Sequence, residues 1–167
     1  MFSDPDLKQF EKAKPLYEKS IEKRKDRSSE STAYLVSGHN YMFSGDLETA
    51  RKRYDKAIEL EKEPNWKFIL SFYLTVSHIF DNDYYGALDN INKVEKGLSS
   101  YNFDDVSLLS IKRDISWQKL ICYAHNQMEE EAYEALAQQI KYNKQRATLL
   151  NDENVFRNVK SFEQYLT

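Results

Sequence analysis

The sequence predicts an all-α fold: three helix-turn-helix units, with one helix before them and one after them. The 167 residues include only 4 Gly and 3 Pro, so few positions interrupt a helix and the helices should be long. Apolar residues recur at helical spacing, and no segment keeps the alternation of a β-strand. A pattern of small and aromatic residues also repeats along the chain. The units are therefore expected to stack as a short α-solenoid whose end helices cap it.

The first expected helix covers residues 5–25. Its apolar stripe consists of Leu7, Phe10, Tyr17 and Ile21. Pro15 within this helix predicts a kink, because proline cannot donate the backbone hydrogen bond of a helix interior. Residues 27–29 are expected to form the turn that follows.

Residues 31–64 predict a helix, a tight turn and a second helix. Gly45 should end the first helix in the left-handed conformation, and Asp46 should cap the second by accepting from its free amides. Gly38 has no side chain, so the second helix can approach its backbone closely. The ring of Tyr54 is expected to be buried at this crossing.

The next helix should begin at Pro64, a favourable residue for a first helical turn, and run to about Phe80. Residues 81–83 then provide a turn and a cap, and the following helix ends near Gly97. A loop is expected over residues 98–103.

Asp104 or Asp105 should cap the next helix, which continues to about Asn126. Glu129 opens another helix, where acidic side chains favour the positive end of the helix dipole. A closing amphipathic helix is expected over residues 153–166. Its apolar stripe consists of Val155, Phe156, Val159, Phe162 and Leu166.

Small residues at a crossing with rings around them resemble the tetratricopeptide repeat (TPR). Residues 31–64 read Tyr34-x2-Ser37-Gly38-x2-Tyr41 and then Ala50-x3-Tyr54, beside the W-x2-L-G-x2-Y and A-x3-F of that repeat. The second-helix pattern recurs around Ala13, Ala87 and, more faintly, Ala132. The resemblance implies one TPR-like domain over residues 1–167. Its repeat units would cover roughly residues 31–64, 65–98 and 104–147, between the leading helix 5–25 and the closing helix 153–166.

Composition limits the classes of function. The chain has 24 Lys and Arg against 27 Asp and Glu, so no overall basic field is available to hold nucleic acid. The first ten residues lack the basic and apolar regions of a signal peptide, and no apolar run is long enough to span a membrane. We therefore expect a cytoplasmic protein with neither a nucleic-acid nor a membrane partner.

The sequence contains no motif of nucleotide binding, hydrolysis, metal binding or thiol redox chemistry. Its histidines, His39, His78 and His125, have no other His or Cys four residues away. Cys122 lies among apolar neighbours and is expected to be a small buried side chain rather than a nucleophile. We expect no catalytic residue, no cofactor and no metal site, and hence no enzyme.

The resemblance also implies a binding surface, since first helices of TPR units line a concave groove. The groove-facing positions carried over to this chain are Leu35, His39, Phe43, Phe72, Val76, Ile79, Trp117, Ile121 and His125. The lysines and asparagines with which chaperone-binding members clamp a terminal carboxylate are missing from these positions, so the expected groove is apolar and aromatic.

Two interpretations of this apolar stripe stay open: neighbouring repeats and the closing helix cover it, or it is a recognition groove. The second predicts a non-catalytic interaction module, an adaptor or scaffold that holds a peptide or helix of another protein. The alternative is a regulatory or self-associating domain whose groove binds its own tail or a second copy in a homodimer.

Overall fold

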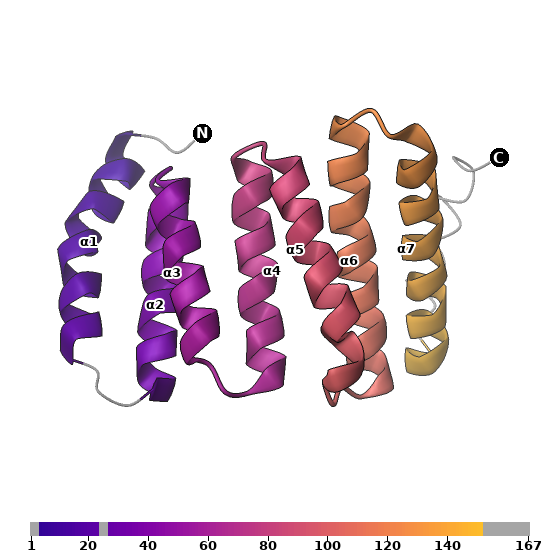
Figure 1. The fold of residues 1–167 in the computed structure, drawn as a ribbon, viewed down its shortest axis with the longest axis horizontal. Coiled ribbons are helices and arrows are strands. Elements are labelled where there is room, and N and C mark those ends of the chain that lie inside the picture. The colour runs from indigo at the N-terminus through magenta and orange to yellow at the C-terminus, as the bar shows by residue number, and fades with distance from the viewer. Residues whose placement is uncertain (1–3, 24–26, 152–167) are drawn as a thin grey trace. The chain divides into compact units, whose positions relative to one another are not determined.

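A computed structural model describes residues 4–23 and 27–151 of the chain (Figure 1). These residues form helices and no strand, so the all-α prediction is confirmed for them. The elements are α1 (Asp4–Lys23), α2 (Arg27–Phe43), α3 (Leu47–Leu60), α4 (Pro64–Phe80), α5 (Tyr84–Gly97), the short 3-10 helix η1 (Leu98–Ser100), α6 (Asp105–His125) and α7 (Glu129–Leu150).

Most helix ends lie where the sequence predicts them. The helix predicted from Pro64 to Phe80 is α4, with Pro64 in its first turn. The turn predicted over residues 27–29 is wrong, because α2 already begins at Arg27. Pro15 lies inside α1, which continues to Lys23. The predicted closing helix, residues 153–166, lies outside the described residues.

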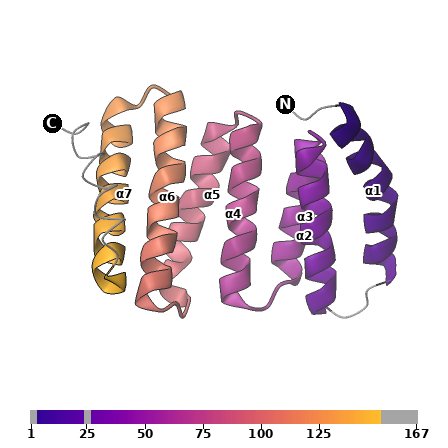
Figure 2. The same ribbon diagram turned by 180° about the vertical axis from the view of Figure 1, so that it is seen from behind.

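The chain divides into two compact units, residues 1–90 and 91–167, with the boundary inside α5. In the first unit, α2 packs against α1 and α3, and α3 packs against α4 (Figures 1 and 2). In the second unit, α6 and α7 form an extensively packed pair. Within each unit, helices thus pack against their neighbours in chain order, as in a helical-repeat protein.

The turn between α2 and α3 has the predicted chemistry. Gly45 has a φ of 88°, a left-handed conformation that glycine adopts without steric cost. The backbone N–H of Asp46 donates to the carbonyl of Tyr41 at 2.9 Å. The Asp46 carboxylate accepts from the backbone N–H of Thr49 at 3.1 Å, which caps α3.

The crossing of α2 and α3 depends on Gly38. A Cβ atom placed on Gly38 would lie 2.6 Å from Cε1 of Tyr54, closer than real side chains allow. Tyr54 is fully buried, and its hydroxyl lies 3.6 Å from the sulfur of Met42. The core cluster of this unit contains Met42, Ala50, Tyr54 and Leu74, from α2, α3 and α4. The missing side chain at Gly38 is therefore the space that the Tyr54 ring fills.

Helix α1 is joined to the α2–α3 pair by a cluster centred on Glu18. Its carboxylate accepts from one guanidinium nitrogen of Arg53, at 2.7 and 2.8 Å. The hydroxyl of Tyr41 donates to the same carboxylate at 3.2 Å, and the Lys14 ammonium lies over the Tyr41 ring. One carboxylate thus connects α1 to both helices of the hairpin.

Polar contacts also connect α4 to α5 in the first unit. The backbone N–H of Gly86 donates to the Asp83 carboxylate at 2.9 Å, and Nδ1 of His78 lies 2.8 Å from its other oxygen. These interactions, Gly86 first, hold the pKa of the Asp83 carboxyl below its usual value. The side-chain amide of Asn90 donates to the carbonyl of Ser71 at 2.9 Å.

In the second unit, Asp104 rather than Asp105 caps α6. Its carboxylate accepts from the backbone N–H of Ser107 at 2.9 Å and from the Ser107 hydroxyl at 2.6 Å. Cys122 is fully buried in α6, as predicted, and burial raises the pKa of its thiol to about 11. Helix α7 ends at Leu150, and its C-cap residue Asn151 has a φ of 50°.

Candidate functional site

The nine residues predicted to face a partner lie on the three helices expected to carry them. Leu35, His39 and Phe43 lie on α2, and Phe72, Val76 and Ile79 lie on α4, all in the first unit. Trp117, Ile121 and His125 lie on α6, in the second unit. Phe43, Trp117 and His125 are exposed, and the other six are partly buried.

In the first unit, the predicted residues of α2 and those of α4 meet around Tyr73 of α4. The His39 ring contacts the Tyr73 ring edge to face, with centroids 4.3 Å apart. The Tyr73 ring stacks on Tyr54 at 6.1 Å and meets Phe72 edge to face at 6.0 Å. We call this surface the α2–α4 aromatic face and define it as Leu35, His39, Phe43, Phe72, Tyr73, Val76 and Ile79.

Tyr73 is a member of this face that sequence reasoning missed. Positions carried over from the resemblance include its neighbour Phe72 but pass over Tyr73 itself. The available signal was spacing, since Tyr73 lies three residues before Val76 and therefore on a neighbouring helical position. Its role depends on the His39 and Tyr54 rings of other helices, which no local pattern specifies.

His39 takes part in this face as a neutral ring. Burial lowers the pKa of its imidazole, because the charged form loses hydration there. Its Nε2 atom is buried and has no hydrogen-bond partner among the described residues. The ring also lies 6.5 Å from Phe43 and 5.7 Å from Tyr54. At neutral pH, His39 therefore contributes an aromatic surface rather than a charge.

Parts of the face also support the core. Leu35 and Val76 pack against the core cluster that contains Tyr54, so their contacts are partly structural. Phe43 stacks on Phe10 of α1 with centroids 6.0 Å apart, yet 38% of its surface stays exposed. Neighbouring helices thus cover some of these side chains and leave others in contact with solvent.

Charge is distributed unevenly between the helices of this unit. Residues 31–43 of α2 contain no Asp, Glu, Lys or Arg, and α4 contains Lys67 alone. In α3, by contrast, half of the 14 residues are charged. The α2–α4 aromatic face is therefore a largely uncharged surface beside a highly charged helix.

The α2–α3 hairpin of the first unit matches a known protein family. The family model of the tetratricopeptide repeat matches residues 31–64, which contain most of α2, the turn at Gly45 and all of α3. These residues are a TPR-like helical repeat. A search among curated proteins found no match to the chain. Tetratricopeptide repeats generally mediate interactions between proteins.

The TPR-like repeat explains the position of the aromatic face. Its first helix, α2, carries Leu35, His39 and Phe43, while its second helix, α3, supplies the buried Tyr54 on which Tyr73 stacks. The match ends at residue 64, where α4 begins. The Phe72 half of the face is therefore contributed by the helix that follows the matched repeat.

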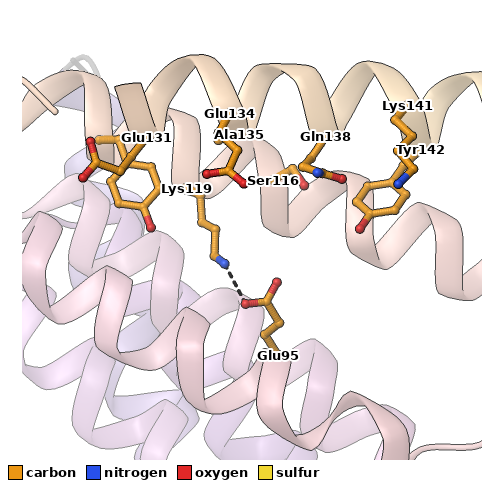
Figure 3. A pocket seen from close by; sticks show the side chains of 10 residues that line it. Glu95, Ser116, Lys119, Glu131, Glu134, Ala135, Gln138, Lys141 and Tyr142 are labelled. Atoms are coloured by element: carbon orange, nitrogen blue, oxygen red, sulfur yellow. Dashed lines mark hydrogen bonds and ion pairs between the residues drawn. The ribbon is translucent and has the colours of Figure 1, made fainter. Parts of the chain in front are cut away.

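The second unit contains a different kind of site. A hollow of about 440 Å³ lies between the end of α5, α6 and α7. Its lining is Glu95, Ser116, Lys119, Tyr123, Glu131, Glu134, Ala135, Gln138, Lys141 and Tyr142 (Figure 3). The ammonium of Lys119 forms an ion pair with Glu95 at 2.6 Å across it. We call this site the polar hollow; sequence reasoning missed it because its lining comes from three helices.

The part of the chain that the structure describes has neither a metal cluster nor a membrane-spanning helix. No group of three His, Cys, Asp or Glu side chains lies close enough there to hold a metal ion. No helix among residues 4–23 and 27–151 is long and apolar enough to cross a bilayer. The aromatic face, the polar hollow and the α6 residues Trp117, Ile121 and His125 are candidate sites of the described chain.

Proposed function

We propose that this chain is a non-catalytic, cytoplasmic interaction module, and that its α2–α4 aromatic face binds an apolar or aromatic peptide or helix of another protein. The observation that carries the proposal is the partly exposed aromatic face on two nearly uncharged helices. Its position on the first helix of a TPR-like repeat supports it, because TPR proteins commonly bind partners on their first helices.

An uncharged surface suits an apolar partner. Removing an apolar surface from water is favourable by about 25 cal/mol per Å², whereas burying an unpaired charge is costly. Phe43 and Phe72 offer such a surface. Lys67 is the one Lys or Arg side chain of α4 that could pair with an acidic ligand. A segment with an apolar stripe therefore fits this face better than an acidic chain terminus does.

We also propose that Trp117, Ile121 and His125, the α6 stripe, make partner contacts of their own in the second unit. Trp117 is 49% exposed, and aromatic residues with this exposure are typical anchors of protein interfaces. Ile121 is partly buried beside it, and His125 is exposed at the end of the helix. Each unit can be tested separately, because each stripe has its own aromatic anchor.

The test compares aromatic truncations inside and outside the proposed surfaces. Phe72→Ala and Trp117→Ala should keep most of the melting temperature but capture far less partner from native lysate. The expected loss of binding free energy is about 2 kcal/mol or more for an anchor residue. The matched controls are Tyr85→Ala in α5 and Tyr133→Ala in α7, which remove exposed rings elsewhere and should leave capture unchanged.

Two results would contradict the proposal. If Phe72→Ala and Trp117→Ala unfold the protein, a cost of about 3–5 kcal/mol typical of core aromatics, the stripe is core and the binding surface lies elsewhere. If ultracentrifugation of the purified chain shows a dimer that Phe72→Ala dissociates, the surface serves self-association instead. Equal loss of capture in the controls would also reject the assignment to these helices.

A further inference from the structure

The polar hollow of the second unit has walls from three helices. Glu95 comes from the end of α5, Ser116, Lys119 and Tyr123 come from α6, and the remaining residues come from α7. Its volume of about 440 Å³ falls in the range of roughly 300–1,000 Å³ that is usual for ligand pockets. The hollow is thus large enough for a long side chain and part of the backbone that carries it.

The charges of the hollow are only partly balanced. Lys119 and Glu95 neutralise each other through their ion pair (Figure 3). Glu131 and Glu134, one helical turn apart on α7, form no ion pair with any of the described residues. Lys141 lies seven residues beyond Glu134, about 10 Å along the helix. One end of the hollow therefore presents two unpaired carboxylates.

Two tyrosine rings complete this lining. Tyr123 and Tyr142 both border the hollow, and the Lys112 ammonium already lies 5.9 Å from the Tyr142 ring centroid. Tyr142 lies eight residues beyond Glu134, about 12 Å along α7, so Tyr123 is the ring available beside the free carboxylates. Carboxylates and an aromatic face together suit a guanidinium, which donates two parallel hydrogen bonds to a carboxylate and stacks on rings.

We propose that the polar hollow binds a basic side chain, arginine above all, of a partner protein. The Glu131 and Glu134 carboxylates pair with the guanidinium, the Tyr123 ring at the same end of the α6–α7 pair flanks it, and the Gln138 amide is available to the peptide backbone that carries it. A metal ion fits less well, because no three metal-binding side chains of the described chain come together. This site is independent of the α2–α4 aromatic face, which lies in the first unit.

The test uses N-acetyl-arginine amide as a probe, with N-acetyl-citrulline amide as its uncharged isostere. In two-dimensional NMR spectra at low salt, the arginine probe should give saturable shifts at Tyr123, Glu131, Glu134 and Gln138. The citrulline probe should bind at least tenfold more weakly. The variant Glu131→Gln/Glu134→Gln should weaken arginine binding at least tenfold and shift the thermal melt no more than Glu129→Gln/Glu130→Gln does, since all four glutamates are exposed at the start of α7.

A matched variant separates a built site from general attraction to an acidic helix. Glu129→Gln/Glu130→Gln removes the same charge from the same helix end but lies outside the lining of the polar hollow. It should change arginine binding less than twofold, and Phe72→Ala should not change it. Equal weakening by both double variants, equal binding of citrulline, or shifts spread over the whole surface would overturn the proposal. The two probes decide it on the unaltered protein even if a variant fails to fold.

Discussion

The two units each contain a pair of antiparallel helices, and the pairs differ at one position of their crossing. In the first unit, Gly38 lets the Tyr54 ring approach the backbone of α2, and the crossing is filled. In the second unit, Ser116-x2-Lys119-Leu120-x2-Tyr123 on α6 has the spacing of Tyr34-x2-Ser37-Gly38-x2-Tyr41, and Leu120 stands where Gly38 does. Beside Leu120 lies an apolar hollow of about 310 Å³, bordered by Ala124, Ala132 and Leu136. Without the glycine, the α6–α7 pair leaves space that the α2–α3 pair fills.

The helices also differ in what they offer a partner. Residues 31–43 are uncharged, whereas α6 contains five charged residues and α7 begins with three glutamates. The first unit accordingly presents rings on neutral helices, and the second presents a hollow with unpaired carboxylates. The glycine crossing and the uncharged helix α2 thus occur together in the segment that matches the tetratricopeptide repeat, and α4 adds the rest of the apolar surface.

The largest expected effect comes from filling the Gly38 crossing. Gly38→Leu should lower the free energy of unfolding in urea by more than the roughly 1–3 kcal/mol usual for overpacking, because the Tyr54 ring has nowhere to move. The matched control is Gly97→Ala, whose Cβ would lie 3.6 Å from the Tyr101 hydroxyl, an ordinary contact. It should change stability by about 0.5 kcal/mol or less. If Gly38→Leu has the same free energy of unfolding as the unaltered chain, the Gly38–Tyr54 crossing does not determine stability.

The next effect concerns the end of the second unit. Leu149 and Leu150 are exposed in the last turn of α7, and an apolar hollow of about 380 Å³ lies beside Leu149, Leu108 and Leu109. The sequence predicts an amphipathic helix over residues 153–166, outside the described residues. Truncation after Asn151 should therefore give an aggregating or poorly soluble protein in size-exclusion chromatography. A truncated chain as monodisperse and stable as the full chain would mean that these residues cover nothing.

Cys122 provides a probe of the second unit. Burial raises its pKa to about 11, so at neutral pH the thiolate is on the order of a hundredfold scarcer than for a free cysteine. The native protein should resist an alkylating reagent for hours and react within minutes in denaturant. Because the chain has a single cysteine, mass spectrometry reports this site alone. Rapid native modification would contradict the packing of α6.

The smallest expected effect is the pH dependence of the first unit. Burial lowers the pKa of His39 in the folded state, so below the unfolded value of about 6.5 the unfolded chain binds more protons. Stability should therefore fall on acidification from that pH, with a slope of at most about 1.4 kcal/mol per pH unit from this group. Urea unfolding of His39→Phe should show a smaller slope than the unaltered chain. If stability falls equally with pH in both proteins, the His39 ring is hydrated rather than buried.

Local chemistry in the sequence was enough to predict the α2–α3 hairpin. Gly45 and Asp46 define its turn, and Gly38 with Tyr54 defines its crossing, because each acts on neighbours less than one repeat away. The helix start at Arg27 was missed, since Ser28 and Ser29 favour a turn as readily as a first helical turn.

The sites themselves were only partly predictable. Groove positions taken from the resemblance identified Phe72 but not Tyr73, whose importance depends on rings in α2 and α3. The polar hollow was missed entirely, because Glu95 and Lys119 meet only when α5 and α6 pack. Charged side chains at helical spacing look the same in sequence whether they face solvent or line a hollow.

The most direct test of the central claim is photo-crosslinking from the α2–α4 aromatic face. Benzoylphenylalanine would replace Phe72 in one protein and Tyr85, a ring 71% exposed on α5, in the other. After irradiation in native lysate, the account predicts a covalent adduct with another protein from position 72 and little or none from position 85. An adduct of equal yield from both positions, or one from position 72 that contains only a second copy of the chain, would contradict it.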